Sequence, residues 1–144
     1  MSLYLEDGYS TLISFTLDPA LRLLEISVTP PGIEGGDPID VTTMRNILWK
    51  TFCPQSLQEL TDCSFVAAYD PVVYDAVGLA LLNVNGLVLV TFSDGSGVEF
   101  WGTLRNFQPN ECAIGERPTA NCTIKPTNRN DSQVEVNPVY IPAT

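Results

Sequence analysis

The side chains in this sequence that could carry out chemistry are mostly carboxylates, and two pairs of them are closely spaced. Asp37 and Asp40 lie in the glycine-broken stretch IEGGDPIDVTTMRN, and Asp70 and Asp75 lie at the start of an apolar segment. Two carboxylates across a cleft could act as the acid and base of a glycosidase, and carboxylate oxygens could also bind Ca²⁺. The simpler interpretation is a solvated loop for the first pair and a helix cap for Asp70.

The sequence contains no histidine, which removes the commonest metal ligand and the usual general base. A nucleophile activated by histidine is therefore impossible within this chain. The glycine loop carries acids instead of the lysine and helix start of a phosphate-binding loop. We therefore predict a protein that is not an enzyme, with no catalytic residue, no metal site and no cofactor.

The four cysteines do not form a CxxC pair, so a zinc knuckle is not indicated. They are Cys53, Cys63, Cys112 and Cys122. Their ten-residue spacings permit two local disulfides, but we favour free, buried thiols, because cytosolic chains rarely hold disulfides. The first residues, MSLYLEDGYS, lack the basic region of a signal peptide, and no 18-residue apolar run occurs. We expect no membrane insertion.

The net charge is strongly negative, with 17 acidic and 7 basic residues among 144. Binding to nucleic acid by neutralising phosphates requires clustered lysine and arginine, so this chain should repel DNA. Apolar residues make up 44% of the sequence, which is enough for one domain with a real core.

Alternating apolar residues predict an all-β sandwich or barrel with one flanking helix. The expected strands cover 11–17, 21–28, 64–69, 86–92, 97–107 and 118–126, and the expected helix covers 72–82 after Asp70-Pro71. Asp18-Pro19 should join the first two strands as a hairpin, and Ser93-Asp94-Gly95-Ser96 should join the fourth and fifth. The expected core-facing residues are Ile13, Phe15, Leu17, Leu24, Ile26, Val28, Val98, Phe100, Gly102, Leu104, Ala120, Cys122 and Ile124.

The connection at about 30–62 has no sustained period but contains many large apolar residues. Loops longer than about 12–15 residues are uncommon inside compact domains, and exposed apolar residues need a partner surface. Trp101 alternates with Phe100, so we expect one in the core and Trp101 at an interface. Glu25 and Glu99 fall on faces away from the core, either a solvated face or a surface that functions through its negative charge.

The motif order is informative. Along the chain come GGDPIDVTTM (35–44), TFCP (51–54), SFVAAYDP (64–71), TFSDGS (91–96), FWG (100–102) and PTANCTIKPT (118–127). In this order, over roughly residues 8–128, they resemble the major tail tube protein of long-tailed, non-contractile bacteriophages of the lambda-like type. The chain departs from the family by lacking the C-terminal immunoglobulin-like domain of some members, and by ending the last motif with Pro-Thr-Asn instead of Thr-Gly.

The resemblance implies a tail tube domain at 1–128 and a C-terminal arm at 129–144. It implies hexameric rings that stack into a hollow tube, with sheets from neighbouring subunits joined into one inner barrel. The implied partners are other copies of the chain, the tape measure protein, the tail terminator and distal tail proteins, and double-stranded DNA that passes without sequence-specific binding. The implied location is the host cytoplasm during assembly and the virion tail afterwards.

Alternatives remain open: another ring-forming tail component such as the terminator or distal tail protein, the inner tube of a contractile tail or secretion system, or a glycan-binding module using Trp49 with Asp37 and Asp40. For the tube, we expect Glu25 or Glu99 to face the lumen. The expected contacts between subunits are Ile39, Val41, Thr42, Met44, Trp49, Phe52 and Trp101. Removing residues 35–50 should then leave a folded monomer that forms no tubes.

Overall fold

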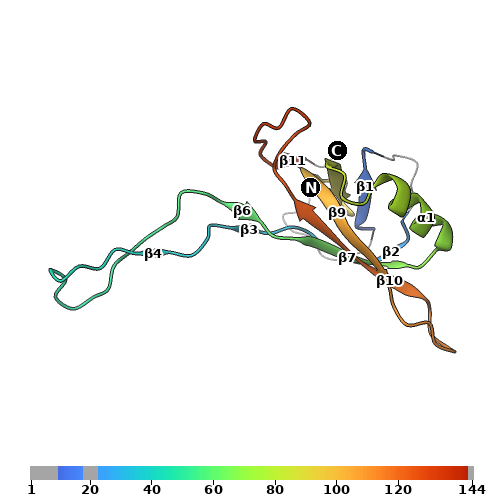
Figure 1. The fold of residues 1–144 in the computed structure, drawn as a ribbon, viewed down its shortest axis with the longest axis horizontal. Helices are drawn as coiled ribbons and strands as arrows, with labels where there is room; N and C mark the ends of the chain where they lie inside the picture. The colour runs from blue at the N-terminus through green and yellow to red at the C-terminus, as the bar shows by residue number, and fades with distance from the viewer. Residues whose placement is uncertain (1–9, 18–22, 143–144) are drawn as a thin grey trace.

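The computed structural model describes residues 10–17 and 23–142, with the side chains of 76–80 excepted (Figure 1). Its body is a seven-stranded antiparallel sheet in the order β1-β8-β9-β10-β7-β2, with β11 also paired to β9. The strands are β1 (Leu12–Phe15), β2 (Glu25–Thr29), β7 (Cys63–Ala68), β8 (Gly86–Thr91), β9 (Gly97–Pro109), β10 (Thr119–Pro126) and β11 (Val139–Ile141). The mostly β architecture with one short helix is as predicted.

The sheet curls into a half-barrel, so that its two end strands approach each other. The backbone N–H of Ile13 in β1 donates a hydrogen bond of 3.2 Å to the carboxylate of Glu25 in β2. This single side-chain contact replaces a ladder of backbone hydrogen bonds between the two strands. The half-barrel is therefore open along the β1–β2 seam within the described residues.

The predicted hairpin of the first two strands is wrong. β1 pairs with β8 and β2 pairs with β7, at opposite ends of the sheet. Alternation of apolar residues identifies the buried face of a strand but contains no information on its partner. The turn expected at Asp18-Pro19 lies outside the described residues.

The predicted core face of the second strand is wrong for two of its three residues, since only Val28 packs against the core. Leu24 and Ile26 are exposed, and Leu23 is buried in their place. A register irregularity between Glu25 and Ser27 breaks the alternation of β2. A β-bulge of this kind changes which residues face the core. Leu17, expected inside, is exposed just beyond the end of β1.

The core lies on the inner face of the curled sheet, and the predicted faces of the long strands are confirmed. Phe100, Gly102 and Leu104 of β9 are buried. Ala120, Cys122 and Ile124 of β10 are buried beside them. The backbones are closely packed at Gly102, where a Cβ atom would lie 3.0 Å from the carbonyl oxygen of Lys125. The turn between β8 and β9 uses Gly95 at φ 89°, as its Asp-Gly sequence predicts.

Helix α1 (Pro71–Ala80) covers one end of the sheet (Figure 1). Its start is fixed by Asp70, whose side-chain Oδ1 accepts a hydrogen bond of 3.0 Å from the N–H of Val72. This confirms Asp70 as the helix cap. The helix ends two residues before the predicted boundary, and Asn83 then adopts a positive φ of 60°.

The C-terminal segment, expected to be an arm, returns to the sheet instead. β11 pairs with residues 97–99 of β9, and β10 pairs with the same edge of β9 from Gly102 onward. The two strands therefore cover one edge of β9 end to end. The connection between them, 127–138, projects from the body (Figure 1).

All four thiols are free, and two of them are buried. Cys63 and Cys122 lie in the core, whereas Cys53 and Cys112 are exposed on loops that leave the body. Burial raises the pKa of Cys63 and of Cys122 to about 12, so almost no thiolate exists there near neutral pH. The expectation of free thiols is met, but burial holds only for these two.

We expect native protein at pH 8 to react with iodoacetamide at Cys53 and Cys112 only. The thiolate is the reactive species, and a buried, un-ionised thiol is also sterically shielded. Mass spectrometry of the labelled peptides measures this, and denaturation in urea should expose all four sites. Native modification of Cys63 or Cys122 at the rate of Cys53 would contradict the described core.

Candidate assembly surface

The connection between β2 and β7 is a long arm, residues 30–62, that leaves the body as two short β-ribbons (Figure 1). The ribbon nearer the body pairs β3 (Ile33–Glu34) with β6 (Glu59–Leu60). The farther one pairs β4 (Ile39–Asp40) with β5 (Phe52–Cys53). The segment expected to be an irregular excursion is therefore an extended antiparallel structure with a tip at residues 41–51.

Polar side chains fold the tip. The N–H of Thr51 donates to Oγ1 of Thr42 at 2.9 Å, and the Asn46 amide donates to the carbonyl of Trp49 at 2.8 Å. Thr43 donates its N–H to the Asn46 side-chain oxygen at 3.1 Å. Thr42, expected to contact a neighbouring subunit, instead makes its hydrogen bonds within the arm.

Asp40 also has a local role. Its Oδ1 accepts a hydrogen bond of 2.9 Å from the N–H of Thr42, and hydrogen bonds from Thr42 hold the pKa of the Asp40 carboxyl below its usual value. Short polar side chains commonly stabilise turns in this way. In the described part of the chain, no group of three or more histidine, cysteine or acidic residues could hold a metal ion. Asp40 thus has a local structural role at the end of β4, and Asp37 lies in the connection between β3 and β4.

The arm presents its large apolar side chains to solvent. Trp49 is 78% exposed, Leu57 is 79% exposed and Met44 is fully exposed. The other exposed apolar residues of the arm are Ile33, Ile39, Val41, Ile47, Leu48 and Phe52. Monomeric proteins rarely expose contiguous apolar surface on this scale unless it is an interaction site. Five of the seven expected contact residues, Ile39, Val41, Met44, Trp49 and Phe52, belong to this surface.

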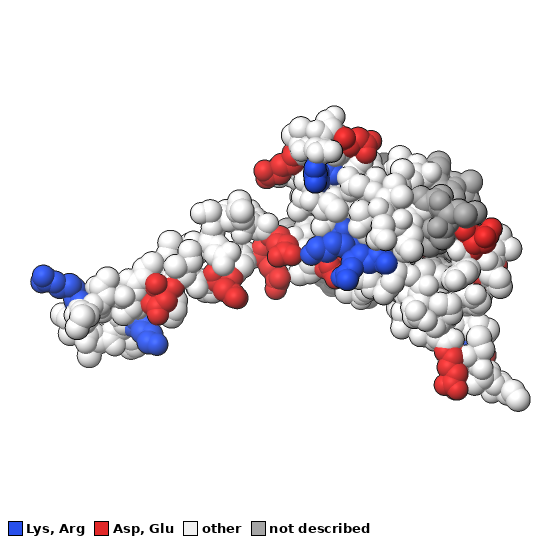
Figure 2. Space-filling model, in the orientation of Figure 1, with Lys and Arg blue, Asp and Glu red and all other residues white. Residues whose placement is uncertain are grey.

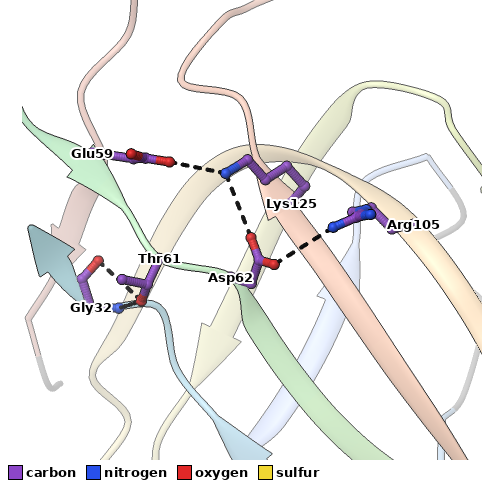
Figure 3. Close-up of polar contacts among 6 residues, drawn as sticks. All are labelled: Gly32, Glu59, Thr61, Asp62, Arg105 and Lys125. Atoms are coloured by element: carbon purple, nitrogen blue, oxygen red, sulfur yellow. Dashed lines mark hydrogen bonds and ion pairs between the residues drawn. The ribbon is translucent and has the colours of Figure 1, made fainter.

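The root of the arm is fastened to the body by ion pairs (Figure 3). Lys125 Nζ of β10 lies 3.1 Å from Glu59 Oε1 and 3.7 Å from Asp62 Oδ1. Arg105 of β9 lies 3.8 Å from the other oxygen of Asp62. The hydrogen bond to Glu59 and the negative charges of Glu59 and Asp62 raise the pKa of Lys125.

These ion pairs are exposed, so each contributes little to stability, about 0–1 kcal/mol. They restrict the direction in which the arm leaves the sheet, because both cations belong to the central sheet and both anions to the returning strand of the arm. Two hydrogen bonds between Gly32 and Thr61 also hold the arm root. The N–H of Gly32 donates to Thr61 Oγ1 at 2.7 Å, and the N–H of Thr61 donates to the carbonyl of Gly32 at 2.8 Å. The arm therefore leaves the sheet in a defined direction.

Charge is unevenly distributed between the arm tip and the rest of the chain. Arg45 and Lys50 lie in the tip, and none of the 17 acidic residues does. All 17 acidic residues lie outside the tip, together with the other five of the 7 basic residues. Figure 2 shows basic side chains at the far end of the arm and acidic ones along its length and at its root. The tip is thus a basic, apolar element on an acidic protein.

The other expected site residues lie in the body. Glu25 is half-buried and its carboxylate accepts the hydrogen bond from Ile13. Glu99 is half-buried in β9, opposite Leu89 of β8 and Val139 of β11. Trp101 is half-buried on the face of β9 opposite Phe100. Lumen exposure of Glu25 or Glu99 stays a prediction, to be checked in a cross-section of an assembled particle.

Sequence reasoning missed the basic tip and the root contacts. Arg45 and Lys50 are recognisable in the sequence as the arm's only basic residues, so charge segregation could have indicated them. Arg105 is positioned for Asp62 by an irregularity in the β9–β10 register, where Thr123 pairs with Asn106 but Ile124 pairs with Leu104. Alternation alone does not reveal such a bulge.

No protein-family model matches the chain, and no curated protein is significantly similar to it in sequence. Among the described residues, no helix has the length and apolar character needed to cross a membrane.

Proposed function

We propose that the chain is a structural subunit that assembles with copies of itself into stacked hexameric rings, forming a bacteriophage tail tube. The observation that carries the proposal is the arm, whose apolar side chains are uncovered over residues 33–57. A folded domain gains nothing from holding such a surface in water. Burial against a neighbouring subunit gives the arm a function, and the motif order supplies the kind of assembly.

The open half-barrel supports the same proposal. β1 and β2 end the sheet as short strands between which the Glu25 contact lies, and each has an edge without a backbone ladder in the described chain. Unpaired edges are templates for pairing with another chain. Joining such edges around a ring would build a continuous inner barrel, and head-to-tail contacts between rings would extend it into a filament.

The net charge of −10 suits a conduit for DNA. A negative wall repels phosphate, and screening at physiological salt restricts this repulsion to about 8 Å from the wall. DNA could therefore pass without adhering. Passage of DNA and enclosure of a tape measure protein belong to this proposal and need no binding site for a small ligand.

Electron microscopy of purified protein, with and without a tail initiator complex as seed, tests the proposal. We expect hollow tubes of stacked rings that lengthen with protein concentration. Single rings that never stack would favour a terminator or distal tail component. A protein that remains monomeric at all concentrations, with or without seed, would overturn self-assembly as its function.

A further inference from the structure

We propose that a groove beside the arm root is the receptor for the arm tip of a second copy of this chain. The inference rests on the self-assembly proposed above and deepens it, because it names both halves of the contact. The donor is the basic, apolar tip at residues 41–51. The acceptor is an acidic groove between the root of the arm and the projecting segment 128–138.

The groove has a volume of about 380 Å³. The arm lines one side with Ile33, Leu57 and Leu60, and the segment before β11 lines the other with Glu135, Val136 and Pro138. Polar side chains, Ser56, Gln58, Asn128 and Asn137, complete the lining, and Glu59 and Glu135 provide negative charge. A concavity that mixes aliphatic, polar and acidic side chains suits side chains that combine an apolar stem with a cationic end.

The acids around the groove outnumber the cations in the described ion pairs. Glu34 lies directly opposite Glu59 in the β3–β6 ribbon, and like charges in directly opposed positions are destabilising. Lys125 is the cation on Glu59, but it also pairs with Asp62. No described ion pair involves Glu135. A further cation would therefore be attracted to this site.

The arm tip supplies that cation together with apolar surface. Arg45 and Lys50 flank Ile47, Leu48 and Trp49, all of which are exposed. The two surfaces are complementary in charge, and both are otherwise uncovered. Complementary charge across an interface fixes its register and excludes wrong partners.

The tip cannot reach the groove of its own chain. The tip begins seven residues beyond Glu34, which at ~3.3 Å per extended residue is on the order of 20 Å from the arm root. Figure 1 shows the arm pointing away from the body, whereas the 127–138 connection projects from the body itself. The occupant must come from another copy. A tip-to-root contact joins two different surfaces, so it is heterologous and propagates from subunit to subunit.

Asn128, which also lines the groove, gives an independent indication. Its buried side-chain oxygen has no hydrogen-bond partner among the described residues. Such unsatisfied acceptors are uncommon in folded proteins. A guanidinium or ammonium group entering the groove is a donor of the kind that this oxygen lacks.

Charge reversal tests the contact. We expect Glu135→Lys, which alters the groove, and Arg45→Glu, which alters the tip, each to weaken self-association by about tenfold or more, because attraction becomes repulsion. Each variant retains one intact half, and the two altered halves are complementary to each other, so an equimolar mixture should regain association in sedimentation velocity. The chain carrying both changes should regain self-association. Matched controls are Glu116→Lys and Arg117→Glu in the exposed β9–β10 loop, which should associate like the wild type.

The outcomes separate this inference from the proposed tube. Wild-type tubes together with unimpaired assembly of Glu135→Lys and Arg45→Glu would overturn the docking site and leave the tube intact. Recovered association in the mixture and in the doubly changed chain, without tubes or rings from the wild type, would support the docking site and overturn the tube. If Glu135→Lys does not fold, Leu57→Lys places a cation in the groove at a position that is 79% exposed and takes its place, with the same expected results.

Discussion

Removal of the arm beyond its root will abolish self-assembly and leave a folded monomer. The informative deletion replaces residues 35–58 with an Asn-Gly turn that joins Glu34 to Glu59, since these residues are already paired. None of the deleted residues is buried, so the core loses no contact of consequence. We expect the free energy of unfolding to change by no more than about 1 kcal/mol. Polymerisation should disappear entirely in light scattering and electron microscopy.

A second variant controls for the shape of the arm. Replacing Met44, Ile47, Leu48 and Trp49 with serine retains the arm while removing most of the apolar surface at its tip. It should polymerise as poorly as the deletion, because burial of that surface provides the driving force. Normal tubes from either variant would show that the arm is not the assembly element. Loss of folding in the deletion would show that the arm stabilises the domain itself.

The physical basis of the deletion experiment is the separation of stability from assembly. The core is on the inner face of the half-barrel, whereas the arm is held to it by exposed ion pairs and two short ribbons. Ordering the arm costs conformational entropy that its own contacts offset only in part. Under the proposed assembly, the remaining gain comes when a neighbour covers the arm.

The sequence predicts features of the fold that depend on neighbouring residues better than features that depend on residues far apart in the chain. The faces of β9 and β10 followed from alternation, because a strand with one buried face places Phe100 and Leu104, or Cys122 and Ile124, on the same side. Pairing of β1 with β8 did not follow, since any apolar face fits several partners. The exposed positions of Leu24 and Ile26 depend on one bulge in β2.

The same limit applies to the candidate site. Length, composition and the lack of a period indicated an arm that needs a partner, and the structure has such an arm. The groove could not be predicted, because Leu57 and Glu135 are brought together only by the return of the chain to β9 as β11. Opposed Glu34 and Glu59 are likewise a consequence of ribbon register, which short irregular sequences do not specify.

Two neighbouring residues of β9 should differ in their effects on stability and on assembly when each is replaced by alanine. Phe100 is 1% exposed and among the largest fully buried side chains, so Phe100→Ala should cost about 3–5 kcal/mol in the free energy of unfolding. That is a large share of the total for a domain of this size, about 5–15 kcal/mol, and thermal unfolding should begin at a much lower temperature. Assembly should fall only because less folded protein is present.

Trp101 points to the other face of β9 and is half-buried in the isolated chain. Trp101→Ala should cost clearly less stability than Phe100→Ala, yet reduce assembly more, because an aromatic side chain at an interface contributes strongly to association. Measuring unfolding by circular dichroism and assembly by sedimentation on the same samples separates the two effects. Equal destabilisation by both substitutions would make Trp101 a core residue. Unimpaired assembly of Trp101→Ala would remove it from the interface, and the arm would then be the principal contact between subunits.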